Sequence, residues 1–119
     1  EPANYGGNYL GATPYQLVAA GLGACTSMTI RMYARRKKIA LEHVQVGVTH
    51  DKIHAEDCDS CSPSDDNSKG SKIDCFERQI TLVGELSDEE RQRLLEIADR
   101  CPVHRTLEGE IAIKTSLKD

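Results

Sequence analysis

Two of the five cysteines in this 119-residue chain, Cys25 and Cys101, fall in segments whose pattern predicts helices. A cysteine becomes a nucleophile or a redox centre when a cation or a helix N-terminus holds it as a thiolate. In CPVHRTL, residues 101–107, Cys101 stands at the expected N-cap of a short helix, with Pro102 at its first position. Cys25 has no helix end beside it. By residue type alone, each is more often a small buried hydrophobe than a nucleophile.

The surroundings of Cys101 in the sequence act on its acidity in both directions. The N-terminus of the short helix and the neighbouring cations Arg100 and Arg105 would lower the pKa of the thiol. The C-terminus of the preceding helix would raise it. The sequence leaves this balance open.

A second group of reactive side chains lies in THDKIHAEDCDSC, residues 49–61, and continues to Cys75. A CxxC pair with a nearby histidine is a zinc pattern, so His54, Cys58, Cys61 and Cys75 would form a tetrahedral site. The usual second pair of closely spaced ligands is missing, and the acidic neighbours disfavour thiolates unless a metal compensates. An exposed polar loop and a redox CxxC are the competing interpretations of the same residues.

A long helix is expected to carry Cys25. Thr13 is a good N-cap, Pro14 suits the first turn, and the helix is predicted from Pro14 to Lys38. The basic run at its end complements the negative pole of the helix dipole. Two glycines in the small apolar stretch VAAGLGAC cost about 1 kcal/mol each in a helix interior. This cost is explained if another backbone approaches closely, so we expect the helix to be central and buried.

The remaining elements alternate between strand and helix patterns. Residues 43–49 and 76–86 alternate apolar and polar side chains, which predicts two half-buried strands. Ser87 and Glu90 form a capping box that opens a helix ending near Cys101. Residues 110–117 are predicted to form a last strand. This order indicates the α+β class, with helices against one face of a mainly antiparallel sheet.

Composition excludes several function classes. The formal net charge of −4 and a pI near 5.6, with no Trp and one Phe, argue against nucleic acid as a partner. No apolar run reaches the roughly 18 residues of a membrane span, and no signal peptide opens the chain. The odd cysteine count does not fit a secreted disulfide scaffold, so we expect the cytoplasm. The length predicts a single domain over residues 1–119, and the missing initial Met indicates processing or a longer polypeptide.

Two motifs in one order carry a family resemblance. TPYQLVAAGLGACTSMTIRMYARRK, residues 13–37, followed by IADRCPVHRTL, residues 97–107, resembles the OsmC and organic hydroperoxide resistance (Ohr) family, in its OsmC-like redox subgroup. The resemblance runs from about Gly11 to Leu117. It implies an OsmC-like fold with a long buried central helix, a second helix and a mainly antiparallel sheet, assembled as an intertwined homodimer.

The resemblance also implies a chemistry and roles for the two cysteines. Cys25 would attack an organic hydroperoxide and become a sulfenic acid, and Cys101 would resolve it as a disulfide that a dithiol reductant reopens. The expected activity is that of a thiol-dependent peroxidase with no cofactor. Its partners would be a second copy of the chain, a small hydroperoxide and the reductant.

The chain departs from the family at the groups that activate the first thiol. Tyr15 stands where the peroxidases have a Glu, and the first 30 residues hold no Arg or Lys to pair with it. We therefore expect the N-terminal strand region to be truncated. Tyr15, Arg31, His104 and Arg105 are the candidates for a supporting role. Two alternatives follow: a non-catalytic small-molecule-binding module of the same fold, and a zinc-stabilised domain that uses the Cys58/Cys61 loop.

Overall fold

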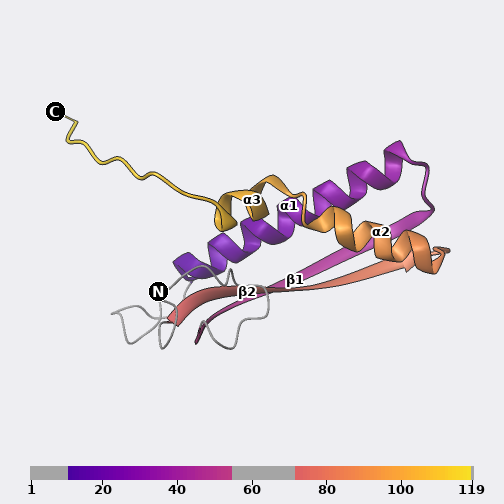
Figure 1. Ribbon diagram of the computed structural model, residues 1–119, viewed down its shortest axis with the longest axis horizontal. Helices are drawn as coiled ribbons and strands as arrows, with labels where there is room; N and C mark the ends of the chain where they lie inside the picture. The colour runs from indigo at the N-terminus through magenta and orange to yellow at the C-terminus, as the bar shows by residue number, and fades with distance from the viewer. Residues whose placement is uncertain (1–10, 55–71, 119) are drawn as a thin grey trace. The chain divides into compact units, whose positions relative to one another are not determined.

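The computed structural model describes residues 11–54 and 72–118 (Figure 1). In these residues the elements follow the order α1 (Pro14–Arg36), β1 (Leu41–His54), β2 (Lys72–Gly84), α2 (Asp88–Ala98) and α3 (Pro102–Glu108). β1 and β2 pair as a two-stranded antiparallel sheet. The predicted α+β class is thereby confirmed. The N-terminal strand region that we expected to be truncated lies outside the described residues.

The described chain divides into two compact units. The first comprises residues 11–20, 47–54 and 72–79, and the second comprises residues 21–46 and 80–118. α1, β1 and β2 each contribute residues to both units, whereas α2 and α3 belong to the second alone. The single domain expected over residues 1–119 stays a prediction.

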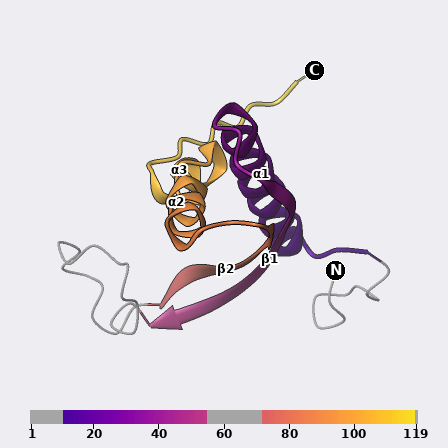
Figure 2. The same cartoon turned by 90° about the vertical axis from the view of Figure 1, so that its right-hand side faces the viewer.

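The second unit is built around one hydrophobic core. In it, α2 and α3 lie side by side with α1, as Figures 1 and 2 show. Side chains from α1, from β1 and from α2 are buried together there: Ile30, Ala34, Leu41, Val44, Leu94 and Ala98. Because β-strands present alternate residues to one face, this core covers one side of the paired strands and leaves the other side polar.

Local signals in the sequence set the helix ends of the second unit. Ser87 and Glu90 bond reciprocally, with Ser87 N–H donating to Glu90 Oε1 at 2.9 Å and Glu90 N–H donating to Ser87 Oγ at 3.1 Å. The predicted capping box is therefore confirmed. α3 begins as expected, with Cys101 at the N-cap and Pro102 at the first position. α2 ends at Ala98, which frees Cys101 to cap the next helix.

α1 ends two residues earlier than the predicted Lys38. Lys38 adopts φ 55°, in the left-handed region, and Ile39 N–H donates to the carbonyl of Ala34 at 2.8 Å. A left-handed residue followed by this backward bond is the Schellman arrangement that terminates helices. Glycine is the residue usually found there, so the lysine carries backbone strain.

The first unit joins the start of α1 to the outer parts of β1 and β2. Thr13 N–H donates to Gln16 Oε1 at 2.8 Å and Gln16 N–H donates to Thr13 Oγ1 at 3.1 Å, which confirms the predicted cap. The ring of Tyr15 stacks on His50 with centroids 4.2 Å apart, and His50 Nε2 lies 2.9 Å from Asp74 Oδ1. Phe76 packs against the same histidine at 4.8 Å. Within the first unit, this aromatic stack joins residues of α1, β1 and β2.

The strands differ from the expectation in length and in number. β1 and β2 extend beyond the predicted 43–49 and 76–86 toward the polar loop, although β2 ends two residues earlier, at Gly84. The last strand predicted at 110–117 is wrong, because residues 110–118 have no strand structure. A strand needs a neighbour for its backbone hydrogen bonds, and no described residue provides one. Ile113 and Leu117 are accordingly 86% and 90% exposed.

Candidate functional site

The two cysteines predicted to act together lie close together in the second unit. α1 carries Cys25 on its half-buried side, and the junction of α2 with α3 carries Cys101, which is 0% exposed. Both are free thiols, and their side chains are hydrogen-bonded to each other. Solvent reaches Cys25 more readily than its partner. The pair thus combines one accessible sulfur with one buried sulfur.

The acidities of the two thiols are driven apart. Burial raises the pKa of Cys25, and the hydrogen bond to Cys101 and the charge of Cys101 raise it further. The N–H of Val103 and the hydroxyl of Thr29 act in the opposite direction. Burial also opposes ionisation of Cys101, but the hydrogen bond from Cys25 and the N–H of His104, 3.5 Å from Sγ, lower its pKa overall. Of the two thiols, Cys101 is therefore the more acidic.

This arrangement has a direct chemical meaning. If Cys101 ionised, the hydrogen bond from Cys25 would give the proton of Cys25 a short path to the Cys101 sulfur, and Cys25 would become the nucleophile. Because Cys101 is the buried partner, the sulfur that gains the charge would be the one that solvent and small molecules reach. The arrangement thus places an accessible sulfur beside a buried one.

The residues expected to support the thiols are placed elsewhere or act through other atoms. Arg31 donates from Nη1 to the carbonyl of Leu41 at 3.1 Å, which ties α1 to the start of β1. The ring of His104 faces Glu108, with Nε2 at 2.8 Å from its carboxylate, and the backbone N–H of His104 donates to the Cys101 sulfur. Arg105 is exposed on α3. The largest contributions to the pKa of Cys25 include no cation.

Tyr15 belongs to the first unit, where it packs on His50 as described above. The structure thus assigns this residue a contact that the sequence comparison did not suggest.

Sequence reasoning missed the donors that do reach the sulfurs. Thr29 lies one helical turn after Cys25, and its hydroxyl also donates to the carbonyl of Cys25 at 2.8 Å. Val103 and His104 follow the N-cap Cys101 at the second and third helical positions, where free N–H groups point back at the capping side chain. Both signals were present in the sequence, as an i, i+4 spacing and as the capping rule itself.

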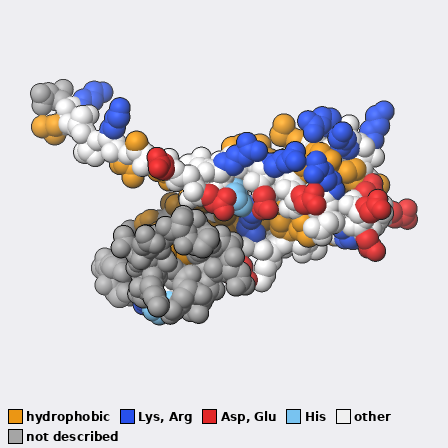
Figure 3. All heavy atoms as spheres, in the orientation of Figure 1, with side chains coloured by type: hydrophobic (Ala, Val, Ile, Leu, Met, Phe, Trp, Pro, Cys, Tyr) orange, Lys and Arg blue, Asp and Glu red, His pale blue; other side chains and the backbone are white. Residues whose placement is uncertain are grey.

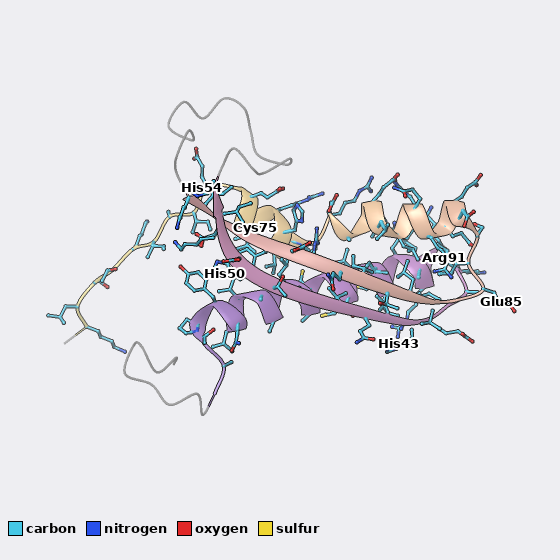
Figure 4. The ribbon with its side chains drawn as sticks, turned by 90° about the horizontal axis from the view of Figure 1, so that it is seen from below. His43, His50, His54, Cys75, Glu85 and Arg91 are labelled. Carbon is cyan, nitrogen blue, oxygen red and sulfur yellow. The ribbon has the colours of Figure 1, made fainter. Side chains whose placement is uncertain are left out.

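The proposed metal ligands are only partly described. Figure 4 shows His54 and Cys75 on the two strands of the hairpin, while Cys58 and Cys61 lie outside the described residues. Within residues 11–54 and 72–118, no group of three or more His, Cys, Asp or Glu side chains is arranged to hold a metal ion. The zinc site stays a prediction.

The α+β fold and the thiol pair between α1 and the junction of α2 with α3 define a class of proteins. A comparison of the sequence with protein-family models identifies that class. Residues 6–116 match the family model described as OsmC-like protein. The chain therefore belongs to the OsmC-like protein family, as the two motifs predicted. No curated protein sequence matches the chain.

Solved structures of this family have the same fold. An organic hydroperoxide resistance protein OsmC from Legionella pneumophila is 25% identical, with a TM-score of 0.66 over 92% of this chain and 71% of its own. A similar protein from Vibrio cholerae, solved with captopril bound in one of its active sites, is 25% identical with a TM-score of 0.60, covering 92% and 67%. An OsmC-like protein from Mycoplasma pneumoniae has 23% identity and a TM-score of 0.64, covering 92% and 69%.

Membrane insertion has no candidate in the described part of the chain. Of the helices in residues 11–54 and 72–118, none has both the length and the apolar character that a membrane crossing requires.

Proposed function

We propose that this protein is a thiol-dependent peroxidase that reduces small organic hydroperoxides through a disulfide cycle between Cys25 and Cys101. The observation that carries the proposal is the pair itself: an accessible thiol hydrogen-bonded to a buried sulfur at a helix N-cap. Membership of the OsmC-like family and the hydroperoxide resistance proteins among its structural neighbours support it.

Besides the hydroperoxide, the proposed reaction cycle requires only Cys25, Cys101 and one external reductant. The thiolate of Cys25 attacks the terminal peroxide oxygen, the O–O bond breaks, and the alkoxide leaves and takes a proton to become an alcohol. Cys25 is then a sulfenic acid. The sulfur of Cys101 attacks the Cys25 sulfur, hydroxide leaves as water after protonation, and a disulfide forms. A dithiol reductant supplies the two electrons that reopen it.

Cys101 would also replace the activating pair that this chain lacks. With Tyr15 in the position of the family Glu and no cation acting strongly on Cys25, the proton of Cys25 needs another acceptor. The Cys101 sulfur accepts a hydrogen bond from Cys25, which would place an ionised Cys101 to take that proton, although the pKa difference between the two thiols favours the proton on Cys25. Cys101 would then serve twice in each turnover, first as proton acceptor and later as the resolving thiol.

A homodimer is part of this proposal. On α1, Met28 is 63% exposed, and Ile113 and Leu117 of the C-terminal segment are 86% and 90% exposed. Large apolar side chains exposed on a helix and on an unpaired extended segment are typical of an interface. Three described free cysteines also fit a reducing compartment such as the cytoplasm.

The test is to add one equivalent of cumene hydroperoxide to the reduced protein and to map disulfides by peptide mass spectrometry. We expect a Cys25–Cys101 disulfide, its loss in Cys25→Ser, and unchanged formation in Cys75→Ser, the matched control at a thiol on β2. If both cysteines of the pair stay reduced while other cysteines oxidise, the cycle is wrong.

A second candidate function is supported by the raised pKa of Cys25. A thiol without a cation among its main contributors suits a non-catalytic binding module of the same fold. Steady-state assays with an added dithiol separate the two candidates, because the module would consume no hydroperoxide at any dithiol concentration.

The zinc-stabilised loop at His54, Cys58, Cys61 and Cys75 stays a proposal of its own. It requires about one zinc per chain in the purified protein and a lower Tm after chelation. Protein that contains no zinc, or whose Tm does not change with chelator, would lead to its rejection.

A further inference from the structure

A groove of about 610 Å³ opens on the second unit beside the thiol pair. One wall comes from the second half of α1 and the other from the end of α2 and the start of α3. Its lining residues are Thr29, Met32, Tyr33, Arg35, Arg36, Ile97, Arg100 and Pro102. Ligand sites in proteins typically measure about 300–1,000 Å³, so the groove has the size of a small-molecule site. Neither cysteine lines it.

Three guanidinium groups line this groove, and that of Arg36 also lies over the ring of Tyr33, 5.5 Å from its centroid. Arg35 and Arg36 occupy the last turn of α1, and Arg100 follows α2. All three residues are exposed, and within the described residues none of them forms an ion pair with a carboxylate. Figure 3 shows Lys and Arg side chains gathered over this part of α1, next to hydrophobic surface. Guanidinium groups bind carboxylate and phosphate oxygens in a bidentate manner.

The groove also has an apolar lining, and the aromatic ring in it is held by a hydrogen bond. Met32, Ile97 and Pro102 contribute aliphatic surface, and the ring of Tyr33 lies among them. The Tyr33 hydroxyl accepts from Arg93 Nε at 3.1 Å, which fixes the ring. Arg93 in turn pairs with Glu96 at 3.0 Å, so its charge is already compensated. The groove therefore combines apolar lining, with a Tyr33 ring held by Arg93, and three guanidinium groups that form no ion pair with a carboxylate of the described residues.

We propose that this groove is a binding site for a single-chain amphiphile with an oxyanion headgroup, whose head pairs with Arg35, Arg36 and Arg100 and whose apolar chain lies on Met32, Ile97 and Pro102. A purely apolar ligand would leave the guanidinium groups without an anionic partner, and an inorganic anion would leave the apolar lining exposed to water. The proposal goes beyond the peroxidase function, because binding here requires no reactive sulfur and no peroxide bond.

Isothermal titration of the full chain with octanoate, 1-octanol, butanoate and octyl phosphate tests the site. Octanoate should bind at least about tenfold more tightly than octanol, which lacks the charge, and more tightly than butanoate, which lacks most of the chain. Octyl phosphate shares the oxyanion chemistry, so its rank against octanoate shows whether a phosphate or a carboxylate headgroup is preferred. Equal binding of octanol and octanoate would overturn the proposal.

Charge variants separate the groove from the general basic surface. Arg100→Gln should weaken octanoate binding about tenfold, because one charge-assisted hydrogen bond is lost. Arg35→Gln should do the same, and it provides a second readout if Arg100→Gln folds poorly. Lys37→Gln, the matched control, removes one positive charge at the same end of α1 without lining the groove and should change binding by less than about twofold. Equal losses in the Arg and Lys variants would refute a built site.

A thiol variant separates this proposal from the peroxidase function. Cys25→Ser should abolish turnover and leave octanoate binding unchanged, because Cys25 does not line the groove. If Cys25→Ser removes both, the groove is part of the thiol site and not a site of its own. If octanoate fails to bind the native chain while the disulfide cycle proceeds, this proposal alone is rejected.

Discussion

Replacing Cys101 by alanine should make the remaining thiol of the pair more acidic. In the native pair, burial raises the pKa of Cys25, and the hydrogen bond to Cys101 and the charge of Cys101 raise it further. Cys101→Ala deletes the last two causes. The N–H of Val103 and the hydroxyl of Thr29, which lower the pKa, both remain. The pKa of Cys25 therefore falls in the variant, although its supposed helper has been removed.

The size of the effect follows from the lost interaction. A hydrogen bond to a charged group contributes about 1.5–3 kcal/mol, so the thiolate fraction of Cys25 at neutral pH should rise by about tenfold or more. Alkylation by iodoacetamide proceeds through the thiolate. The alkylation rate of the Cys25 peptide, followed by mass spectrometry across a pH series, should rise by the same factor at neutral pH.

Cys75→Ala is the matched control, because it truncates a thiol at the same atom on β2 and should leave the Cys25 profile unchanged. Circular dichroism checks α3, since loss of a capping side chain costs about 1 kcal/mol. An alkylation profile in Cys101→Ala that is unchanged, or moved to higher pH, would show that Cys101 carries no charge in the reduced protein. The proposed proton transfer from Cys25 would then be refuted.

Three further predictions concern the fold. Lys38→Gly should stabilise the protein by about 0.5–1 kcal/mol in urea unfolding, because it removes strain at φ 55°; no gain would contradict the left-handed helix end. Gly84→Ala should destabilise it by more than about 2 kcal/mol, because a Cβ at φ 149° would clash with the Ala40 carbonyl, and a neutral effect would contradict this close approach. The hydrogen bond from His50, followed by the charge of Lys52, lowers the pKa of Asp74, and burial opposes this effect. The stability that the Asp74 carboxylate contributes is therefore present above its unfolded pKa and is lost as the pH falls below about 4. Asp74→Asn should reduce the fall of Tm at acidic pH, and a fall equal to that of the native protein would show that Asp74 does not contribute.

Elements defined by neighbouring residues could be predicted from the sequence. The caps at Thr13, Ser87 and Cys101 depend on contacts three residues away, and all three are confirmed. The strand expected at 110–117 failed because strand pairing depends on a partner far away in the sequence or on another chain. An alternating pattern indicates that a segment can pair, but not what it pairs with.

In the candidate site, too, the features set by local sequence could be predicted and those set by distant contacts could not. The choice of Cys25 and Cys101 followed from their motifs, and the structure brings the two sulfurs together. The division of acidity between them could not be predicted, because it depends on which sulfur is buried and which N–H groups point at it. The contact of Tyr15 with His50 joins residues 35 positions apart on different elements, and no local pattern indicates it.

The position of Cys101 at the start of α3 links redox state to helix stability. In the reduced protein its sulfur accepts the N–H of His104 and satisfies an otherwise open end of the helix. A disulfide sulfur is uncharged and a poor acceptor, so each oxidation would withdraw that cap, and each reduction would restore it. The first turn of α3 would then alternate between an ordered and a frayed state once per cycle. Faster amide hydrogen exchange at His104 in the oxidised protein would report this fraying, and equal exchange rates in the two redox states would exclude it.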